Sequence, residues 1–84
     1  MEQQVGRVTH YFGKIGVAAV ELEDELNVGD TIHFKGHTSD WTQEVESIQI
    51  EHEMVEKAGP GDEIGIKVKE HAREHDIVYK VLEE

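Results

Sequence analysis

Two segments of the chain alternate regularly between apolar and polar positions. From Ile64 to Lys69 every second side chain is aliphatic, and the segment from Thr31 to Lys35 repeats this pattern around Ile32 and Phe34. The side chains of a β-strand point alternately to its two faces. Each segment therefore predicts a strand that buries one face and exposes the other.

Three further strands are predicted from less regular patterns. Gln4 to Phe12 has the period of a strand but no purely apolar face. Val17 to Leu22 is a nearly continuous apolar run, which is typical of a strand that is covered on both faces or bends across a barrel. The last strand is predicted to close the structure with Ile77, Tyr79 and Val81 pointing inward.

The middle of the chain, from Val45 to Ile50, has an irregular apolar spacing. Val45 and Ile48 are three positions apart, whereas residues on one face of a strand are two apart. A β-bulge near Glu46 and Ser47 would place Val45, Ile48 and Ile50 on one face.

The segment that follows predicts a brief helical turn and then a tight corner. Met54, Val55 and Ala58 have a spacing that suits a single helical turn. Gly59-Pro60-Gly61-Asp62 predicts a type II turn, because proline favours the second position and glycine accepts the positive φ of the third. A second Gly-Asp pair, Gly29-Asp30, predicts another turn before the Thr31 strand.

These short strands, separated by turns and without a long helix, predict an all-β fold. We expect a small closed antiparallel β-barrel of six or seven strands, formed by residues 1–84 as one domain. Its predicted core contains Val8, Val20, Ile32, Phe34, Ile48, Ile50, Ile64, Ile66 and Ile77.

The composition excludes several classes of site and partner. The chain of 84 residues has no cysteine, which excludes disulfides and thiolate chemistry. Its formal net charge of −11 repels phosphate backbones and anionic lipids at long range. No apolar run approaches the roughly 18 residues that span a bilayer, so we expect a cytoplasmic protein without membrane contact.

The corner at Pro60 and its surroundings resemble a known family. Val55, Ala58 and Pro60-Gly61-Asp62, followed by an alternating strand, are similar to the second-domain β-barrel of the translational GTPases, of which elongation factor Tu is the best known. The resemblance implies the same barrel and a contact with tRNA, the ribosome or a translation factor. It continues, in the family's order, at Gly6-Arg7-Val8, Gly13, Ile15 and Leu26 to Ile32, and covers about Val5 to Val81.

The chain departs from that family before its last strand. His75-Asp76 stands where the family commonly has Gly-Asp. A turn with positive φ is costlier without glycine, so we expect either a strained turn or one of another shape.

No motif for catalysis or for a cofactor is present in the sequence. A phosphate loop of the GxxxxGK[ST] type is missing, so no nucleotide should bind. His71 and His75 have a spacing that would suit zinc only on a helix, and neither Ser39 nor Ser47 lies in a nucleophile motif. We therefore expect no enzyme activity, no metal and no cofactor.

Half of the basic side chains fall on or near the two regular strands. Lys35, Lys67, Lys69 and Arg73 form the candidate binding site, which would contact RNA phosphate or an acidic protein surface. The alternative is that they are ordinary exposed residues, with lysines that protect a strand edge from aggregation.

The sequence thus favours a non-enzymatic binding module, and two functions remain open for it. The resemblance favours a role in translation, with tRNA, the ribosome or a factor as partner. The acidic charge favours a protein-interaction or accessory barrel unrelated to translation, like the one at the C-terminus of collagenase-like peptidases.

Overall fold

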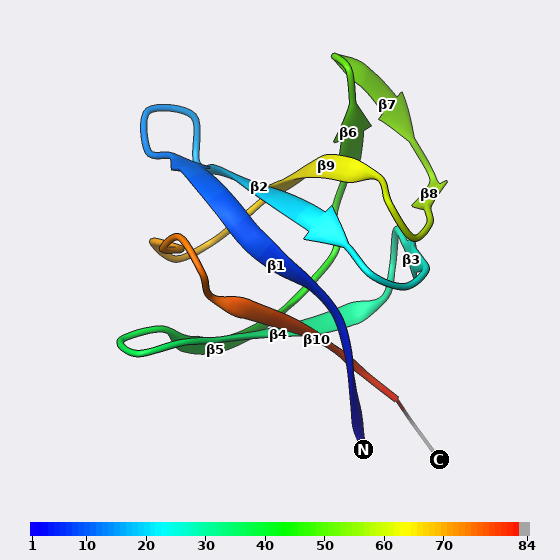
Figure 1. The fold of residues 1–84 in the computed structure, drawn as a ribbon. Helices are drawn as coiled ribbons and strands as arrows, with labels where there is room; N and C mark the ends of the chain where they lie inside the picture. Colours follow the sequence, from blue (N-terminus) through cyan, green and yellow to red (C-terminus); the bar gives the residue numbers. More distant parts are fainter. Residues whose placement is uncertain (83–84) are drawn as a thin grey trace.

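A computed structural model describes residues 1–82 as an all-β structure, with no helix in that range (Figure 1). The all-β prediction is confirmed. The strands are β1 (Glu2–Phe12), β2 (Val17–Leu22), β3 (Leu26–Asn27), β4 (Thr31–Lys35), β5 (Asp40–Glu44), β6 (Ile48–Ile50), β7 (Glu53–Val55), β8 (Lys57–Ala58), β9 (Glu63–Lys67) and β10 (Ile77–Val81).

Eight of these strands form one antiparallel sheet in the order β5-β4-β10-β1-β2-β9-β6-β7, and β3 pairs with β8. The sheet curls strongly on itself (Figure 1). The prediction of a closed barrel is wrong, because β5 and β7 are edges of the described sheet and do not pair with each other.

The concave side of the sheet encloses a single aliphatic core. Most of the predicted core is confirmed, but Ile50 only packs against the core from a partly exposed position. Ile77 lies outside the core as well. The buried apolar residues are Val5, Val8, Ala18, Val20, Leu22, Leu26, Ile32, Phe34, Val45, Ile48, Ala58, Ile64, Ile66, Val68, Ala72 and Val78.

The predicted orientation of the last strand is wrong by one residue. β10 pairs with β4 so that Val78 lies opposite the core residue Phe34. Paired residues share a face of the sheet, so Val78 points inward and Ile77 and Tyr79 point outward. The sequence favoured the wrong face because the outward positions of this strand are also apolar.

The chain from Val45 onward also differs from the prediction. The structure has neither a bulged strand nor a helical turn there: β5 ends at Glu44, and β6, β7 and β8 follow as separate short strands. Val45 is buried between strands, whereas Met54, predicted to lie in the helical turn, is 64% exposed.

Three corners share one hydrogen-bonding pattern. In the first, Asp30 N–H donates to Asn27 O (3.1 Å) and Asn27 N–H donates to Asp30 Oδ2 (2.9 Å). Gly29 N–H donates to Val45 O (2.9 Å), and Val45 N–H returns a bond to Asp30 O (2.8 Å). The same four bonds recur at Gly59-Pro60-Gly61-Asp62 with Leu22 as the partner, and at Arg73-Glu74-His75-Asp76 with Val8 as the partner.

The third corner has this shape without a glycine. His75 has a φ of 75°, close to the 89° of Gly61 and the 97° of Gly29. The type II turn predicted at Gly61 is therefore confirmed, and His75 adopts the left-handed conformation that the other corners leave to glycine. A non-glycine residue in this region costs about 1–2 kcal/mol.

A buried glutamine spans the seam that the sheet leaves open. Gln43 on β5 is 4% exposed, and its Nε2 donates to Lys67 O at 2.9 Å. Its Oε1 accepts from Lys69 N–H and from Trp41 Nε1, each at 2.9 Å. The side-chain amide thus joins the edge strand β5 to the chain around the end of β9.

Removal of the Ile66 side chain beyond Cβ should destabilise the fold strongly. Ile66 is fully buried and pairs with Ala18 and Ile48. We expect Ile66→Ala to lower the free energy of unfolding by roughly 2–5 kcal/mol through lost burial and a cavity, as measured in urea. The exposed neighbour Lys67 provides the control, because Lys67→Ala should change the free energy of unfolding by less than about 0.5 kcal/mol. Equal losses of stability in the two variants would contradict the assignment of Ile66 to the inner face of β9.

His75→Gly should stabilise the protein, because it removes the left-handed strain. We expect the free energy of unfolding to rise by roughly 0.5–1 kcal/mol. This is the strain energy that the substitution removes, reduced by the greater conformational entropy of glycine in the unfolded chain. Gly61→Ala is the converse test, since nothing lies within 4 Å of the added Cβ and only the backbone is strained. It should cost about 1 kcal/mol. Thermal unfolding measures the stability of both variants. A His75→Gly variant less stable than wild type would contradict the claim that His75 is strained.

Candidate functional site

The four basic residues predicted to bind a partner are exposed and come from different parts of the fold. Lys35 ends β4, and Lys67 ends β9, which is separated from β4 by β10, β1 and β2 in the sheet. Lys69 follows β9, and Arg73 lies in the loop before β10. Among residues 1–82 none of them forms an ion pair. A binding role for these residues stays a prediction.

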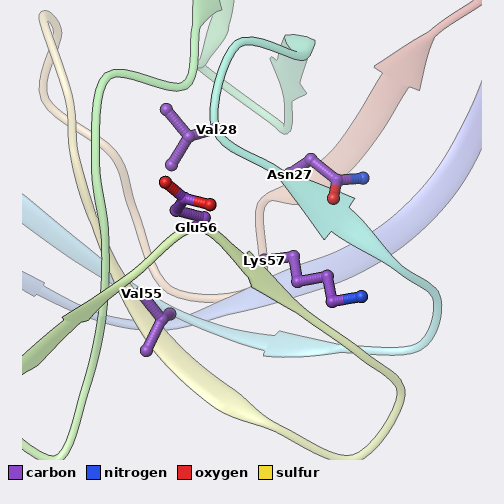
Figure 2. Close-up of a pocket in the computed structure, with 5 residues that line it drawn as sticks. All are labelled: Asn27, Val28, Val55, Glu56 and Lys57. Atoms are coloured by element: carbon purple, nitrogen blue, oxygen red, sulfur yellow. The ribbon is translucent and has the colours of Figure 1, made fainter.

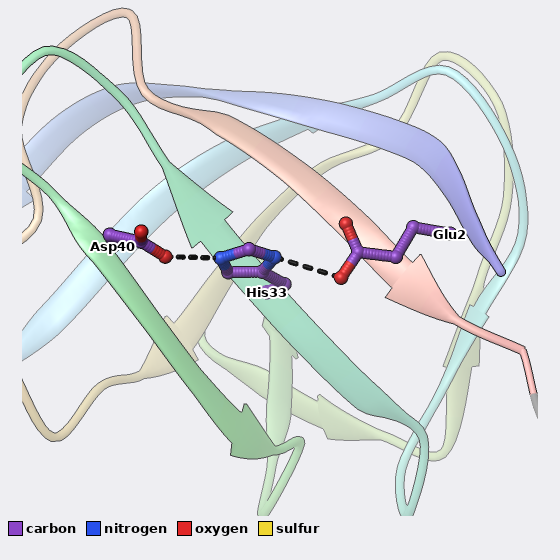
Figure 3. A network of polar contacts seen from close by, with 3 residues as sticks. All are labelled: Glu2, His33 and Asp40. Atoms are coloured by element: carbon purple, nitrogen blue, oxygen red, sulfur yellow. Dashed lines mark hydrogen bonds and ion pairs between the residues drawn. The ribbon is translucent and has the colours of Figure 1, made fainter.

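A histidine on β4 joins three strands (Figure 3). His33 on β4 places Nδ1 at 2.8 Å from Glu2 Oε2 of β1, and Nε2 at 2.5 Å from Asp40 Oδ1 of β5. The hydrogen bond to Asp40 and the charge of Glu2 raise the pKa of His33 despite its burial. The same hydrogen bond lowers the pKa of Asp40, helped by the charges of His33 and Lys35. The arrangement fits a charged imidazolium that donates two hydrogen bonds and ties the strands together.

A hollow of about 740 Å³ lies beside β3, β7 and β8. The residues that line it are drawn in Figure 2. They are Asn27, Val28, Val55, Glu56 and Lys57. The side chains of Asn27 and Lys57 point the same way, and Val55 lies apart from them. In the described chain every buried side-chain nitrogen or oxygen has a hydrogen-bond partner, so no buried polar group is aimed unpaired into this hollow. Its lining contains no serine, threonine, cysteine or histidine.

A second hollow, an apolar groove of about 370 Å³, lies on the outer face of the sheet over β2 and β9. Val17, Ala19 and Gly65 lie along it, and the β1–β2 hairpin adds Phe12 and Ile15, which are 47% and 66% exposed. A Cβ at Gly65 would lie 3.2 Å from Val17 Cγ1, so glycine keeps the groove open.

The outward row of side chains continues from the groove across the neighbouring strands. Ala19 pairs with Gly65, Gly65 with Gln49, and Gln49 with Met54, which places these four residues on one face. The largely exposed Met54 therefore lies on the same face, beside Gln49, at the edge strand β7.

The rim of the groove carries carboxylates. Glu51, His52 and Glu63 all line it. Glu63 lies directly opposite Glu21 on β2, and Glu21 is 3.8 Å from Arg7. Like charges that lie opposite each other on a sheet repel. Of Glu21 and Glu63, only Glu21 has a basic side chain within ion-pair distance among the described residues.

The loop that supplies part of the rim is conformationally unusual. Glu51 and His52 connect β6 to β7 with φ values of 49° and 68°. A two-residue hairpin loop with positive φ at both positions usually contains Asn-Gly. The sequence did not predict this loop, because the run Ile50-Glu51-His52-Glu53 contains none of the glycine, proline or asparagine residues that mark a turn.

Two further classes of site are absent from the described residues. Within residues 1–82, no group of three or more histidine or acidic side chains is placed to hold a metal ion. The same range includes no helix long and apolar enough to cross a membrane.

Known proteins similar to this chain include two peptidases. An uncharacterized protease of Methanocaldococcus jannaschii is 41% identical over 81 residues, which are 95% of this chain and 20% of the protease. A collagenase of Porphyromonas gingivalis is 44% identical over 78 residues, 90% of this chain and 22% of the collagenase. No family model matches the chain.

The fold has a counterpart among solved structures. The C-terminal domain of a Geobacillus thermoleovorans protein named as a U32 peptidase superposes with a TM-score of 0.89 and 25% identity, over 95% of this chain and 93% of that domain. The chain is similar to a U32 peptidase C-terminal domain. It spans about a fifth of the length of the two peptidases that it matches.

The resemblance to translational GTPases was therefore wrong as a guide to relatives. An elongation factor 1-alpha of Natronomonas pharaonis does match at 40% identity, but over only 57 residues, or 68% of this chain. The peptidase matches cover 90% or more. They favour the alternative that the sequence left open, a domain like that of collagenase-like peptidases, over a role in translation.

The His33 network should make stability depend on pH. The pKa of His33 is raised in the folded state, so its contribution is fully present below the unfolded value of about 6.5 and is lost as pH rises through the folded value. We expect the difference in unfolding free energy between wild type and His33→Gln to shrink across that range.

Proton NMR of the His33 ring measures the folded pKa directly. Asp40→Asn is the matched variant and should lower that pKa, since it removes the main group that raises it. A His33 pKa at or below 6.5 in the wild type would contradict the charged network.

Proposed function

We propose that this chain is a non-catalytic protein-interaction domain that serves the catalytic part of a U32-type peptidase. The observation that carries the proposal is the match to a U32 peptidase C-terminal domain along almost the whole chain, while only a fifth of the related peptidases is covered. An accessory domain is what such a partial match favours.

The chemistry of the described side chains supports a non-catalytic role. Gln43 and Asp76 are buried polar residues whose side chains bond to backbone groups of the fold. His33 has both ring nitrogens engaged by carboxylates, so it has no free nitrogen with which to act as a base. A catalytic group needs a base or nucleophile within reach of a substrate.

Charge supports a protein as the partner. The formal charge of −11 opposes the approach of any polyanion. Apolar groups gather on the outer face instead, as at protein interfaces.

A domain exchange in the Porphyromonas gingivalis collagenase tests the proposal. The region that matches this chain is deleted from the collagenase, or is replaced by this chain. We expect deletion to reduce gelatin cleavage by tenfold or more and replacement to restore at least a third of it, because a shared fold presents a shared interface. Gelatin cleavage and the cleavage of a short peptide are measured for each form.

A chimera with Ile66→Ala in this chain serves as the unfolding control and should behave like the deletion. The isolated chain should release no peptide from gelatin. A folded chimera that is no better than the deletion, or an isolated chain that cleaves gelatin, would contradict the proposal.

A further inference from the structure

The apolar groove over β2 and β9 has the features of a binding site for a particular kind of segment. We propose that it binds a short stretch of a partner protein in which apolar side chains stand next to lysine or arginine. The proposal rests on the protein-interaction role proposed above and assigns it to one face of the domain.

The apolar content of this face is the first argument. Single exposed hydrophobic residues are ordinary on protein surfaces, but contiguous ones mark interaction sites. Of the large hydrophobic residues that are exposed in the described chain, three lie on or beside the groove: Phe12, Ile15 and Met54. The floor between them is made of small residues, Ala19 and Gly65, which leave room for a side chain from outside.

Unbalanced negative charge at the rim is the second argument. Within residues 1–82 neither Glu51 nor Glu63 has a basic side chain within ion-pair distance. Glu63 also faces Glu21 across the sheet. A lysine or arginine on the bound segment would relieve this repulsion, which gives the segment its basic component.

The strained loop is the third argument. Glu51 and His52 both occupy the left-handed region, where Asn-Gly would relieve the backbone strain. Backbone strain of this kind tends to persist where function requires it. Here it holds a carboxylate and an imidazole at the rim of the groove.

The same charges argue against a second copy of this chain as the occupant. Two copies that met through this face in a symmetric dimer would bring two sets of the rim carboxylates, Glu51 and Glu63, into one interface. Each copy also carries a formal charge of −11. A basic partner is therefore favoured over self-association.

The test is an amide NMR titration of the whole chain with three synthetic probe peptides. Acetyl-KLKLK-amide is apolar and basic, acetyl-ELELE-amide keeps the apolar side chains and reverses the charge, and acetyl-KSKSK-amide keeps only the charge. We expect saturable shifts only with the first peptide, clustered at Ala19, Gln49, Glu51, Glu63 and Gly65.

Variants separate the apolar and the charged contributions. Ile15→Ser should weaken binding of the first peptide at least fivefold, and the double variant Glu51→Gln with Glu63→Gln should weaken it similarly and reduce its salt dependence. Val28→Ser is the matched control, because Val28 is an exposed aliphatic residue that lines the other hollow. It should leave binding unchanged.

The loop variant Glu51→Asn with His52→Gly distinguishes a role of the loop in peptide binding from a role in stability. It should raise the midpoint of thermal unfolding while it weakens peptide binding at least threefold. Shifts scattered over the surface, equal binding of the acidic peptide, or an effect of Val28→Ser as large as that of Ile15→Ser would overturn the proposal.

The collagenase chimera separates this inference from the function on which it rests. Ile15→Ser and the double glutamine variant are placed in the active chimera and should lower gelatin cleavage. If the chimera is active and both variants leave cleavage unchanged, the groove assignment fails and the accessory role stands. If the chimera is inactive while the basic peptide still shifts the groove, the accessory role fails and the groove assignment stands.

Discussion

The corners of this domain must pair their backbone groups with strands that are remote in sequence, and the rest of the sheet depends on that pairing. At each corner an aspartate carboxylate accepts from the N–H of the first residue of the turn. The N–H of the residue before the aspartate and the C=O of the aspartate both bond to the backbone of one buried residue. Buried backbone groups without partners would each cost about 1–3 kcal/mol. Val8, Leu22 and Val45 therefore both fill the core and fix where β10, β9 and β4 begin.

Gln43 extends the same principle to the open seam. A side-chain amide has the donor and acceptor groups of a peptide, and Gln43 uses them toward Lys67 and Lys69 as a neighbouring strand would. Its Nε2 also lies 3.3 Å from Glu44 O. These bonds connect the edge strand β5 to the chain at the end of β9 without a ladder of strand pairing. Strand periodicity did not reveal this, because it reports which face of a strand is buried and not whether the edges of a sheet pair.

The success of the sequence prediction followed the strength of the local signal. Ile32, Phe34, Ile64 and Ile66 were placed correctly because one face of each strand is polar. Ile77 was misplaced because both faces of β10 carry apolar groups, so its orientation is fixed by the partner strand β4, which periodicity cannot reveal. The groove escaped notice for a related reason: Ala19 and Gly65 meet only through sheet pairing.

The residues that suggested a translation factor are largely the residues that the corners require. Gly61-Asp62 and Gly29-Asp30 supply the positive φ and the carboxylate of each turn, so any protein with these corners would resemble any other at the same positions. His75 is the converse case: it replaces the glycine of the Gly-Asp pair in sequence, yet the corner keeps the positive φ and the same backbone hydrogen bonds. Fold-determining residues thus report architecture and leave function undetermined. Function has to be sought among side chains that the fold does not need, and on this domain those are the exposed Phe12, Ile15 and Met54 with the carboxylates beside them.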